Sequence, residues 1–267
     1  MGELVTEPVT PSSPRPVRRP LLTQSWRELA FLHWPVDPSR VSGLLPPGTR
    51  PDTLGGVTYV GLVAFRVPWT NALRGARLPH AGTFAETNVR LYSVDGEGRR
   101  GVVFRSLEAS RLLFALTARK TLHMPYMWAS MRADRDGDVL TYTSRRRWPG
   151  PRGTRSRIAI RTGRPIAEPT ALQRFLTARW GLHVARRGRT LHLPNEHPRW
   201  SLHTAELVDL EDELVAAAGL PAPTGHPISV LYAPGVVAKF GRPTTIRQSD
   251  GGLSDQGPRG SGPDNRR

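Results

Sequence analysis

The chain has 267 residues and a formal net charge of +16 at neutral pH, carried almost entirely by arginine because Lys120 and Lys239 are its only lysines. The absence of cysteine excludes disulfides, thiolate metal sites and cysteine nucleophiles, and it suits a reducing cytoplasm. No apolar run approaches the ~20 residues of a membrane helix, and the proline-rich start lacks a signal peptide's apolar core. We therefore expect a cytoplasmic protein without a membrane partner.

Both ends of the chain have the composition of disordered segments. Residues 1–20 are rich in Pro, Ser and Thr, and residues 248–267 are mostly Gly, Ser, Asp, Pro and Arg. Such segments bury too little apolar surface to offset the entropy of ordering. We predict disordered tails over 1–20 and 248–267 and a single domain over 21–247, within the ~200–250 residues that one β-rich domain can occupy.

The first half of the domain is predicted to contain mainly strands. In chain order we expect strands over 25–36, 56–67, 83–92 and 101–109, with short helices over 38–45 and 111–118. The apolar run 56–67 indicates burial on both faces, and Gly61 within it marks a bend or bulge. Ser110 has the side chain of a helix cap for the second helix.

Strands also dominate the second half. They are expected over 122–133, 139–147, 154–161, 182–187, 190–193 and 200–210, with helices over 168–180 and 211–218 and two last strands within 228–240 around Pro234-Gly235. This pattern predicts a β-rich α+β domain, a closed or nearly closed antiparallel β-barrel with a few short helices.

The strand from Thr83 to Tyr92 carries a polar row. Alternation along a strand places Glu86, Asn88, Arg90 and Tyr92 on one face. An acid, an amide, a guanidinium and a phenol side by side need either water or a lined cavity, because unpaired charges are costly to bury. The row is therefore either a solvated face with a Glu86–Arg90 ion pair or the wall of a pocket.

Five motifs follow one another in a recognisable order. They are His33-Trp34-Pro35-Val36-Asp37, Leu45-Pro46-Pro47-Gly48, Phe84 to Tyr92, Ser106-Leu107-Glu108-Ala109, and Ala118-Arg119 with Leu122-His123-Met124-Pro125-Tyr126. Over nearly all of residues 22–240 the chain resembles the YqjF-like bacterial family of unknown function, whose members resemble acetoacetate decarboxylase in fold. The resemblance implies a cone-like β-barrel with an internal pocket.

The resemblance also bears on the chemistry. Acetoacetate decarboxylase uses a lysine that follows a proline to form a Schiff base with a β-keto acid. The matching residue here is Tyr126, and Lys120, six residues away, is the weaker alternative for such chemistry. Glu86 resembles the pocket glutamate of the decarboxylase.

These residues define the main hypothesis, a pocket that binds a small organic acid or carbonyl compound. Glu86 and Tyr126 are the candidate catalytic residues, one accepting or moving a proton and the other donating to a carbonyl oxygen. The candidate substrate-binding residues are Asn88, Arg90, Ser106, Arg119 and Tyr142, with Arg90 matching a carboxylate. Whether the protein is a non-Schiff-base lyase, a related enzyme or a binding protein stays open.

Part of this set has an ordinary explanation. Tyr142, Ser144 and Arg146 share one face of a predicted hairpin, and Ser106 and Glu108 share a face of another strand. Antiparallel sheets commonly present such alternating polar residues to water.

A second function class follows from the arginines. The Arg145–Arg189 region begins with eight arginines and no acid over 145–164, which would suit an anionic polymer or nucleic acid. Against this alternative, no nucleic-acid reading motif occurs, and a charge run is usually a solvated face.

No cofactor, metal or oligomeric state is indicated. The spacings of His183, His192, His197 and His203 match no zinc motif, so we expect them in loops and at the surface. His33 and His123 are expected to fix hydrogen bonds in the core.

Overall fold

The computed structural model describes residues 5–72, 75–78, 80 and 82–246. Its strands are β1 (Leu22–Val36), β2 (Thr49–Pro51), β3 (Thr58–Ala72), β4 (Ala76–Arg77), β5 (Phe84–Asp95), β6 (Arg100–Ala109), β7 (Tyr126–Asp136), β8 (Val139–Trp148), β9 (Arg155–Pro165), β10 (Gly181–Arg186), β11 (Arg189–Glu196), β12 (His203–Asp212), β13 (Ser229–Phe240) and β14 (Thr244–Thr245). Its helices are α1 (Pro38–Ser42), α2 (Leu112–Leu122), α3 (Ala171–Thr177) and α4 (Leu214–Ala217).

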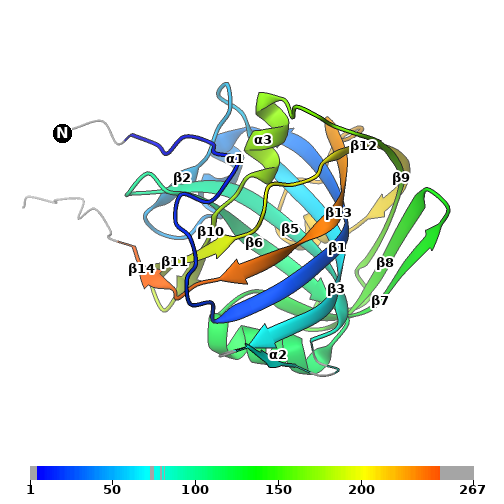
Figure 1. Ribbon diagram of the computed structural model, residues 1–267, viewed down its shortest axis with the longest axis horizontal. Coiled ribbons are helices and arrows are strands. Elements are labelled where there is room, and N and C mark those ends of the chain that lie inside the picture. Colours follow the sequence, from blue (N-terminus) through cyan, green and yellow to red (C-terminus); the bar gives the residue numbers. More distant parts are fainter. Residues whose placement is uncertain (1–4, 73–74, 79, 81, 247–267) are drawn as a thin grey trace, which may run out of the picture.

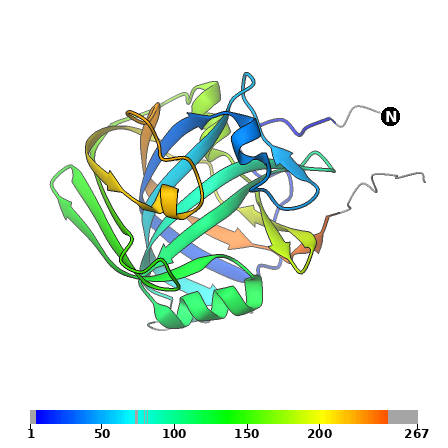
Figure 2. The ribbon, with the colours of Figure 1, turned by 180° about the vertical axis from the view of Figure 1, so that it is seen from behind.

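Nine strands of the described chain form a nearly closed ring (Figures 1 and 2). Their order is β6-β7-β8-β9-β12-β13-β1-β3-β5, and β5 pairs again with β6. Pairing is antiparallel around the ring except between β6 and β7, and β10 also lies parallel to β6. Parallel strands cannot be joined by a tight hairpin, so α2 connects β6 to β7. The predicted β-rich barrel is confirmed, and these two parallel pairings are the difference.

The core lies on both sides of the sheet. Alternate residues of one strand belong to different apolar clusters: Tyr92 of β5 packs in the interior of the ring, and Leu91 beside it packs on the outer side. The outer cluster is covered in part by α1 and α4, through Val41 and Leu214. β3 is buried on both faces from Thr58 to Phe65, as its unbroken apolar sequence predicted.

Helix α2 covers one end of the barrel (Figure 1) and buries Phe114, Ala115 and Ala118. It starts one residue later than predicted and extends four residues further. Ser110 was wrongly predicted to cap this helix. Its hydroxyl instead accepts a hydrogen bond from the Ala85 amide at 3.1 Å, which ties the helix start to β5. Among the described residues no helix has the length and hydropathy needed to cross a membrane.

Helix α3 is shorter than the predicted helix over 168–180. A capping box begins it: the Thr170 hydroxyl accepts from the Gln173 amide, while the Gln173 side chain accepts from the Thr170 amide. The helix ends after two turns, and its Leu176 carbonyl turns toward the barrel interior, where side chains of β5 donate to it.

Gly61 is not a bend or bulge, because β3 keeps its register with both β1 and β5 across it. It is a point of close approach. A Cβ at this position would lie 3.1 Å from Cγ of Arg90 and 3.2 Å from Cδ2 of His33. Glycine therefore makes room for two polar side chains that enter the interior.

The two strands predicted around Pro234-Gly235 are one continuous strand, β13. Gly235 has φ of +143° and faces Arg27 of β1, where a Cβ would collide with the Trp26 carbonyl. Gly235 is therefore needed because the β1 backbone approaches closely, and not because the chain turns at this point. The local sequence does not distinguish a Pro-Gly pair at a turn from one at such a close approach.

Residues 5–20, which we expected to be disordered, form no helix or strand and lie against the barrel. The side chain of Val17 is buried, and its amide donates to the Glu196 carboxylate at 2.6 Å. The indole of Trp180 donates to the Thr10 carbonyl at 3.1 Å. The disordered tail predicted over 248–267 lies outside the described residues.

Candidate functional site

The interior of the barrel contains a buried acid held between two polar side chains. The Tyr126 hydroxyl donates to Oε2 of Glu86 at 3.0 Å, and the Asn88 amide donates to Oε1 at 3.2 Å. The two strands that carry Glu86 and Tyr126 are separated by β6, where Ala109 pairs directly with Glu86. Tyr126 is paired with Leu107 of β6, so its phenol reaches Glu86 diagonally across that strand.

The environment of Glu86 places its titration near neutrality. Its side chain is only 3% exposed, and burial raises its pKa to about 7, while the hydrogen bonds from Asn88 and Tyr126 oppose the rise. The pKa of Tyr126 is raised well above its ordinary value by burial and by the adjacent Glu86. A carboxyl group that titrates near pH 7 can both give and accept a proton under physiological conditions.

Aromatic rings enclose this pair on the side of α2. Phe114 packs edge-on against the Tyr126 ring, with centroids 5.2 Å apart, and also contacts Phe84 at 4.4 Å.

The oxygen Oδ1 of Asn88 is buried and accepts no hydrogen bond in the described structure. An unpaired buried acceptor beside a carboxyl group is a position where a donor from a ligand or water fits.

Arg90 also enters the interior, but it points away from Glu86. Its guanidinium donates to the Leu176 carbonyl at 3.3 Å and lies over the rings of Phe31 and Tyr92, each at 5.7 Å. No carboxylate of the described residues forms an ion pair with it, so the Glu86–Arg90 pair considered from sequence is not formed. Arg90 therefore gives the interior an uncompensated positive charge near α3.

The end of the polar row is joined to His33. Nε2 of His33 lies 2.8 Å from the Tyr92 hydroxyl, which donates to the Leu176 carbonyl at 3.0 Å. Burial and then the positive charge of Arg90 lower the pKa of His33 well below its ordinary value. The expected core role of His33 is confirmed by its hydrogen bond to Tyr92, and the lowered pKa favours the neutral imidazole.

The remaining candidates are separated from the acid. Ser106 and Tyr142 face the outer side of the sheet, where the Tyr142 hydroxyl donates to the Glu28 carbonyl. Arg119 on α2 donates to the Tyr126 carbonyl at 2.8 Å and so supports its backbone without entering the interior. The structure thus joins Glu86, Asn88 and Tyr126 and places the other candidates elsewhere.

The polar face of β6 that carries Ser106 and Glu108 and the polar face of β8 that carries Tyr142 and Arg146 are joined by a buried ion pair. Nη2 of Arg146 donates to Oε1 of Glu108 at 2.6 Å, and both side chains are at most 1% exposed. Burial raises the pKa of Glu108 even though Arg146 opposes this. These side chains hold β6 to β8 across β7 and are not an ordinary solvated face.

Sequence reasoning missed a second charged group in the interior. Arg179 is buried over Phe175 at 4.2 Å and over Tyr92 at 4.7 Å, and it forms an ion pair with Asp52. Asp52 also pairs with Arg100. Arg179 and Asp52 are 127 positions apart, so no local pattern could have indicated the pair.

The histidine prediction was wrong for three of the four residues. His183, His192 and His197 are buried, with His183 between Asp95 and Ser93 and with the His197 ring tilted against the rings of Trp180 and Trp200. Within the part of the chain that the structure describes, no three acids or histidines gather as a metal site.

The arginine-rich stretch is also less uniform than its sequence suggested. Arg157 pairs with Asp209 at 2.7 Å, and Arg161 pairs with Glu206 at 3.1 Å. These acids come from β12, which lies beside β9. Tertiary pairing therefore neutralises part of the surface that we considered for nucleic acid.

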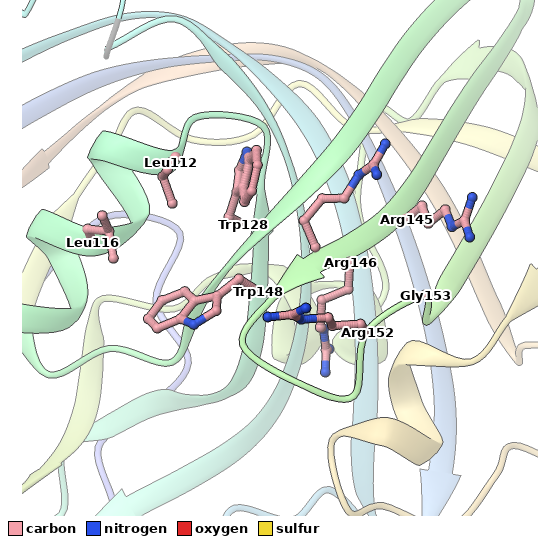
Figure 3. Close-up of a pocket in the computed structure, with 9 residues that line it drawn as sticks. Leu112, Leu116, Trp128, Arg145, Arg146, Trp148, Arg152 and Gly153 are labelled. Carbon is pink, nitrogen blue, oxygen red and sulfur yellow. The ribbon is translucent and has the colours of Figure 1, made fainter.

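Four cavities among the described residues have linings that do not include Glu86, Asn88 or Tyr126. One of them, about 590 Å³, lies between α2 and β8 (Figure 3), and the other three are about 380, 370 and 280 Å³. Both lysines are exposed, on α2 and β13. No lysine is therefore available beside the buried acid.

The fold and sequence have recognisable relatives. Residues 23–237 match DUF2071, described as an uncharacterized conserved protein. The uncharacterized protein YqjF of Bacillus subtilis (strain 168) is 30% identical over 213 residues, covering 78% of this chain and 86% of that protein.

Among solved structures, an acetoacetate decarboxylase from Legionella pneumophila aligns with a TM-score of 0.61 and 13% identity, covering 88% of this chain and 93% of that one. The enduracididine biosynthesis enzyme MppR complexed with pyruvate aligns with a TM-score of 0.60 and 15% identity, covering 86% and 91%. At these identities the likeness establishes an acetoacetate decarboxylase-like fold.

Proposed function

The chain belongs to the DUF2071 family, and we propose that it binds a small organic acid or carbonyl compound in the barrel interior, with Glu86 and Tyr126 as its reactive pair. The observation that carries the proposal is the buried Tyr126–Glu86 hydrogen bond of 3.0 Å together with the pKa of about 7 for the carboxyl group. A buried carboxyl group with a pKa near 7 beside a hydroxyl donor is typical of a site that transfers protons.

Charge supports an acidic ligand. Glu86 is largely uncharged below pH 7, and Arg90 has no carboxylate partner among the described residues. This part of the interior therefore attracts a carboxylate, and a guanidinium is well matched to it. On a strand, the Cα atoms of Glu86 and Arg90 are roughly 13 Å apart. A short acid therefore contacts only one of the two side chains directly, and its interaction with the other is a longer-range electrostatic one.

The proposed chemistry does not need a Schiff base. In the decarboxylation of a β-keto acid, the electrons of the breaking carbon–carbon bond form an enolate as carbon dioxide leaves. The Tyr126 hydroxyl would donate to the enolate oxygen, and Glu86 would give its proton to the carbon and recover one from solvent. Stabilising the oxyanion with a fixed donor is a large part of such catalysis.

The relatives agree with this ligand class. MppR was solved with pyruvate and with a condensation product of pyruvate, and the Legionella protein is named for a keto-acid substrate. We extend from these proteins only the class of ligand, a small keto acid or related carbonyl compound.

A thermal-shift screen against short keto acids and carboxylic acids tests the proposal. A ligand at a hundred times its Kd adds about 2.7 kcal/mol of stability, so a binder raises the Tm clearly. We expect the shift to be lost in Glu86→Gln and Tyr126→Phe and kept in Glu211→Gln, an exposed acid on β12. Shifts of equal size in all four proteins would exclude the interior acid as the site.

A further inference from the structure

The cavity between α2 and β8 has the chemistry of a second binding site. It has a volume of about 590 Å³ and combines four arginines with two leucines and two tryptophans. Volumes of this size are typical of small-molecule sites. We propose that it binds a phosphate monoester with an apolar or aromatic body, independently of the interior acid.

One wall of the cavity is apolar. Leu112 and Leu116 project from α2 toward Trp128 and Trp148, and the arginines lie beyond the tryptophans (Figure 3). Leu112, Leu116 and Trp148 are each at least 36% exposed, and the neighbouring Leu113 is 66% exposed. Three of the seven large exposed apolar side chains in the described residues thus line this cavity, with Leu113 next to them in the chain, and such a cluster marks a surface that another molecule covers.

The other wall carries positive charge without counter-ions. Arg145, Arg147 and Arg152 form no ion pair with any carboxylate of the described residues. Arg145 also lies directly opposite Arg155 on β9, and like charges in that arrangement repel each other. An anion bound in the cavity beside Arg145 offsets part of this repulsion, and a phosphate can accept hydrogen bonds from more than one of the arginines that line the cavity.

The fourth arginine has a different part in the site. Arg146 is buried and neutralised by Glu108, so it anchors β8 and contributes little net charge to the cavity. This anchor fixes β8, which carries Arg145 and Arg147, and Arg152 lies in the turn that follows the strand. The buried Glu108–Arg146 pair therefore lies between the unpaired arginines of the cavity and the apolar core on the outer side of the sheet.

Trp148 is held in place for a stacking partner. Arg119 lies over its ring at 5.3 Å while donating to the Tyr126 carbonyl at 2.8 Å. The cation orients the indole and covers part of it, and the remaining surface faces the cavity. A flat or extended apolar group can pack there while its phosphate reaches the arginines.

This combination favours a small amphipathic anion over a nucleic-acid strand. A protein that binds a single-stranded nucleic acid needs a continuous basic groove with aromatic side chains along it. Here the arginines further along, such as Arg157 and Arg161, are paired with acids, and leucines close the opposite side. An apolar wall facing a compact cationic wall matches a phosphate at one end of an apolar body.

The test is calorimetric titration of the full chain with 1-naphthyl phosphate at low salt. We expect the double variant Arg147→Gln/Arg152→Gln to weaken binding about tenfold or more, because it removes both charged hydrogen-bond donors. The matched control is Arg186→Gln/Arg189→Gln, which removes the same charge from another cavity, lined by Arg186, Arg187 and Arg189. The control and Glu86→Gln should each leave the affinity within about twofold of the parent value.

Ligand controls decide the chemistry. Inorganic phosphate and 1-naphthol should each bind about tenfold more weakly than the ester, since each keeps only one half of the recognition. Equal affinity for inorganic phosphate, or equal losses in the two arginine variants, would overturn the proposal as simple charge attraction. Binding of oligothymidylate or phosphatidylglycerol vesicles without binding of naphthyl phosphate would also overturn it, in favour of a polymer or a membrane surface.

Discussion

The hydroxyl of Tyr126 lies 3.0 Å from Oε2 of Glu86, although 40 positions and the whole of strand β6 separate the two residues. The sheet brings them together across β6, where Ala109 pairs with Glu86 and Leu107 pairs with Tyr126. This relationship joins a proton carrier to a hydrogen-bond donor in the barrel interior, and its consequences can be measured.

The first prediction concerns the pH dependence of stability. Glu86 has a pKa of about 7 in the folded protein, against an ordinary value of 4.5. Its uncharged form stabilises the fold fully below pH ~4.5, and this contribution of about 3 kcal/mol is lost as pH rises through 7. Since glutamine cannot ionise, the Glu86→Gln variant should gain about 3 kcal/mol relative to the parent between pH 4.5 and 8.

Urea unfolding at pH 4.5, 6 and 8 measures this difference in unfolding free energy. Glu211→Gln, which alters an exposed acid, should follow the parent protein at all three values. A Glu86→Gln difference that does not vary with pH would mean that the pKa of Glu86 is the same in the folded and unfolded states, which contradicts the prediction.

The second prediction concerns the hydrogen bond itself. Tyr126→Phe removes the donor that opposes the rise in the Glu86 pKa, so the pKa should move above 7. The loss should also cost about 1–2 kcal/mol of stability. Carbon NMR of labelled glutamate follows the titration directly. A lowered pKa in this variant would show that the phenol does not donate to the ionised carboxylate.

The third prediction concerns the ion pair on the outer side of the sheet. Glu108→Gln leaves the Arg146 guanidinium buried without its carboxylate and should cost roughly 3–5 kcal/mol. The double variant Glu108→Leu/Arg146→Met should be much less destabilised, because neither charge is then buried.

An exposed pair is the control for this comparison. Arg157→Gln disrupts the contact with Asp209, where both side chains are more than 40% exposed, and should cost less than about 1 kcal/mol. Equal losses in Glu108→Gln and Arg157→Gln, measured by urea unfolding, would contradict the buried role of the Glu108–Arg146 pair.

The fourth prediction concerns the entry of Arg90 into the interior. Gly61→Ala would place a methyl group 3.1 Å from Cγ of Arg90 and 3.2 Å from the His33 ring, and it should cost about 1–3 kcal/mol. In an Arg90→Ala background the same substitution should cost less, because one of the two contacts is gone. A double-mutant cycle from unfolding data measures the coupling, and strict additivity would contradict it.

The sequence predicted much of the local structure for a physical reason. Alternation along a strand depends only on backbone geometry, so the shared face of Glu86, Asn88 and Tyr92 could be read directly from their spacing. The unbroken apolar run in β3 likewise indicated burial on both faces. Five motifs in a fixed order indicated the barrel fold, which the solved relatives share.

Other features depended on which strands become neighbours. The polar face that carries Ser106 and Tyr142 looks similar in sequence to the row of Glu86, yet it lies on the outer side of the sheet. The direction of Arg90 is set by the Leu176 carbonyl of α3, which lies 86 positions away. Neither outcome has a local signal, because each depends on contacts between distant segments.

By itself, the sequence determined the alternation of side chains, the strand-rich class and the identity of the acid in the polar row, since these follow from backbone geometry and residue type. Only the tertiary structure decided that Tyr126 meets Glu86, that Arg179 is buried with Asp52, and that Arg157 and Arg161 form ion pairs with acids of β12. The reason is that burial and ion pairing depend on which distant residues become neighbours. Those neighbours are set only when the strands pair into the closed ring.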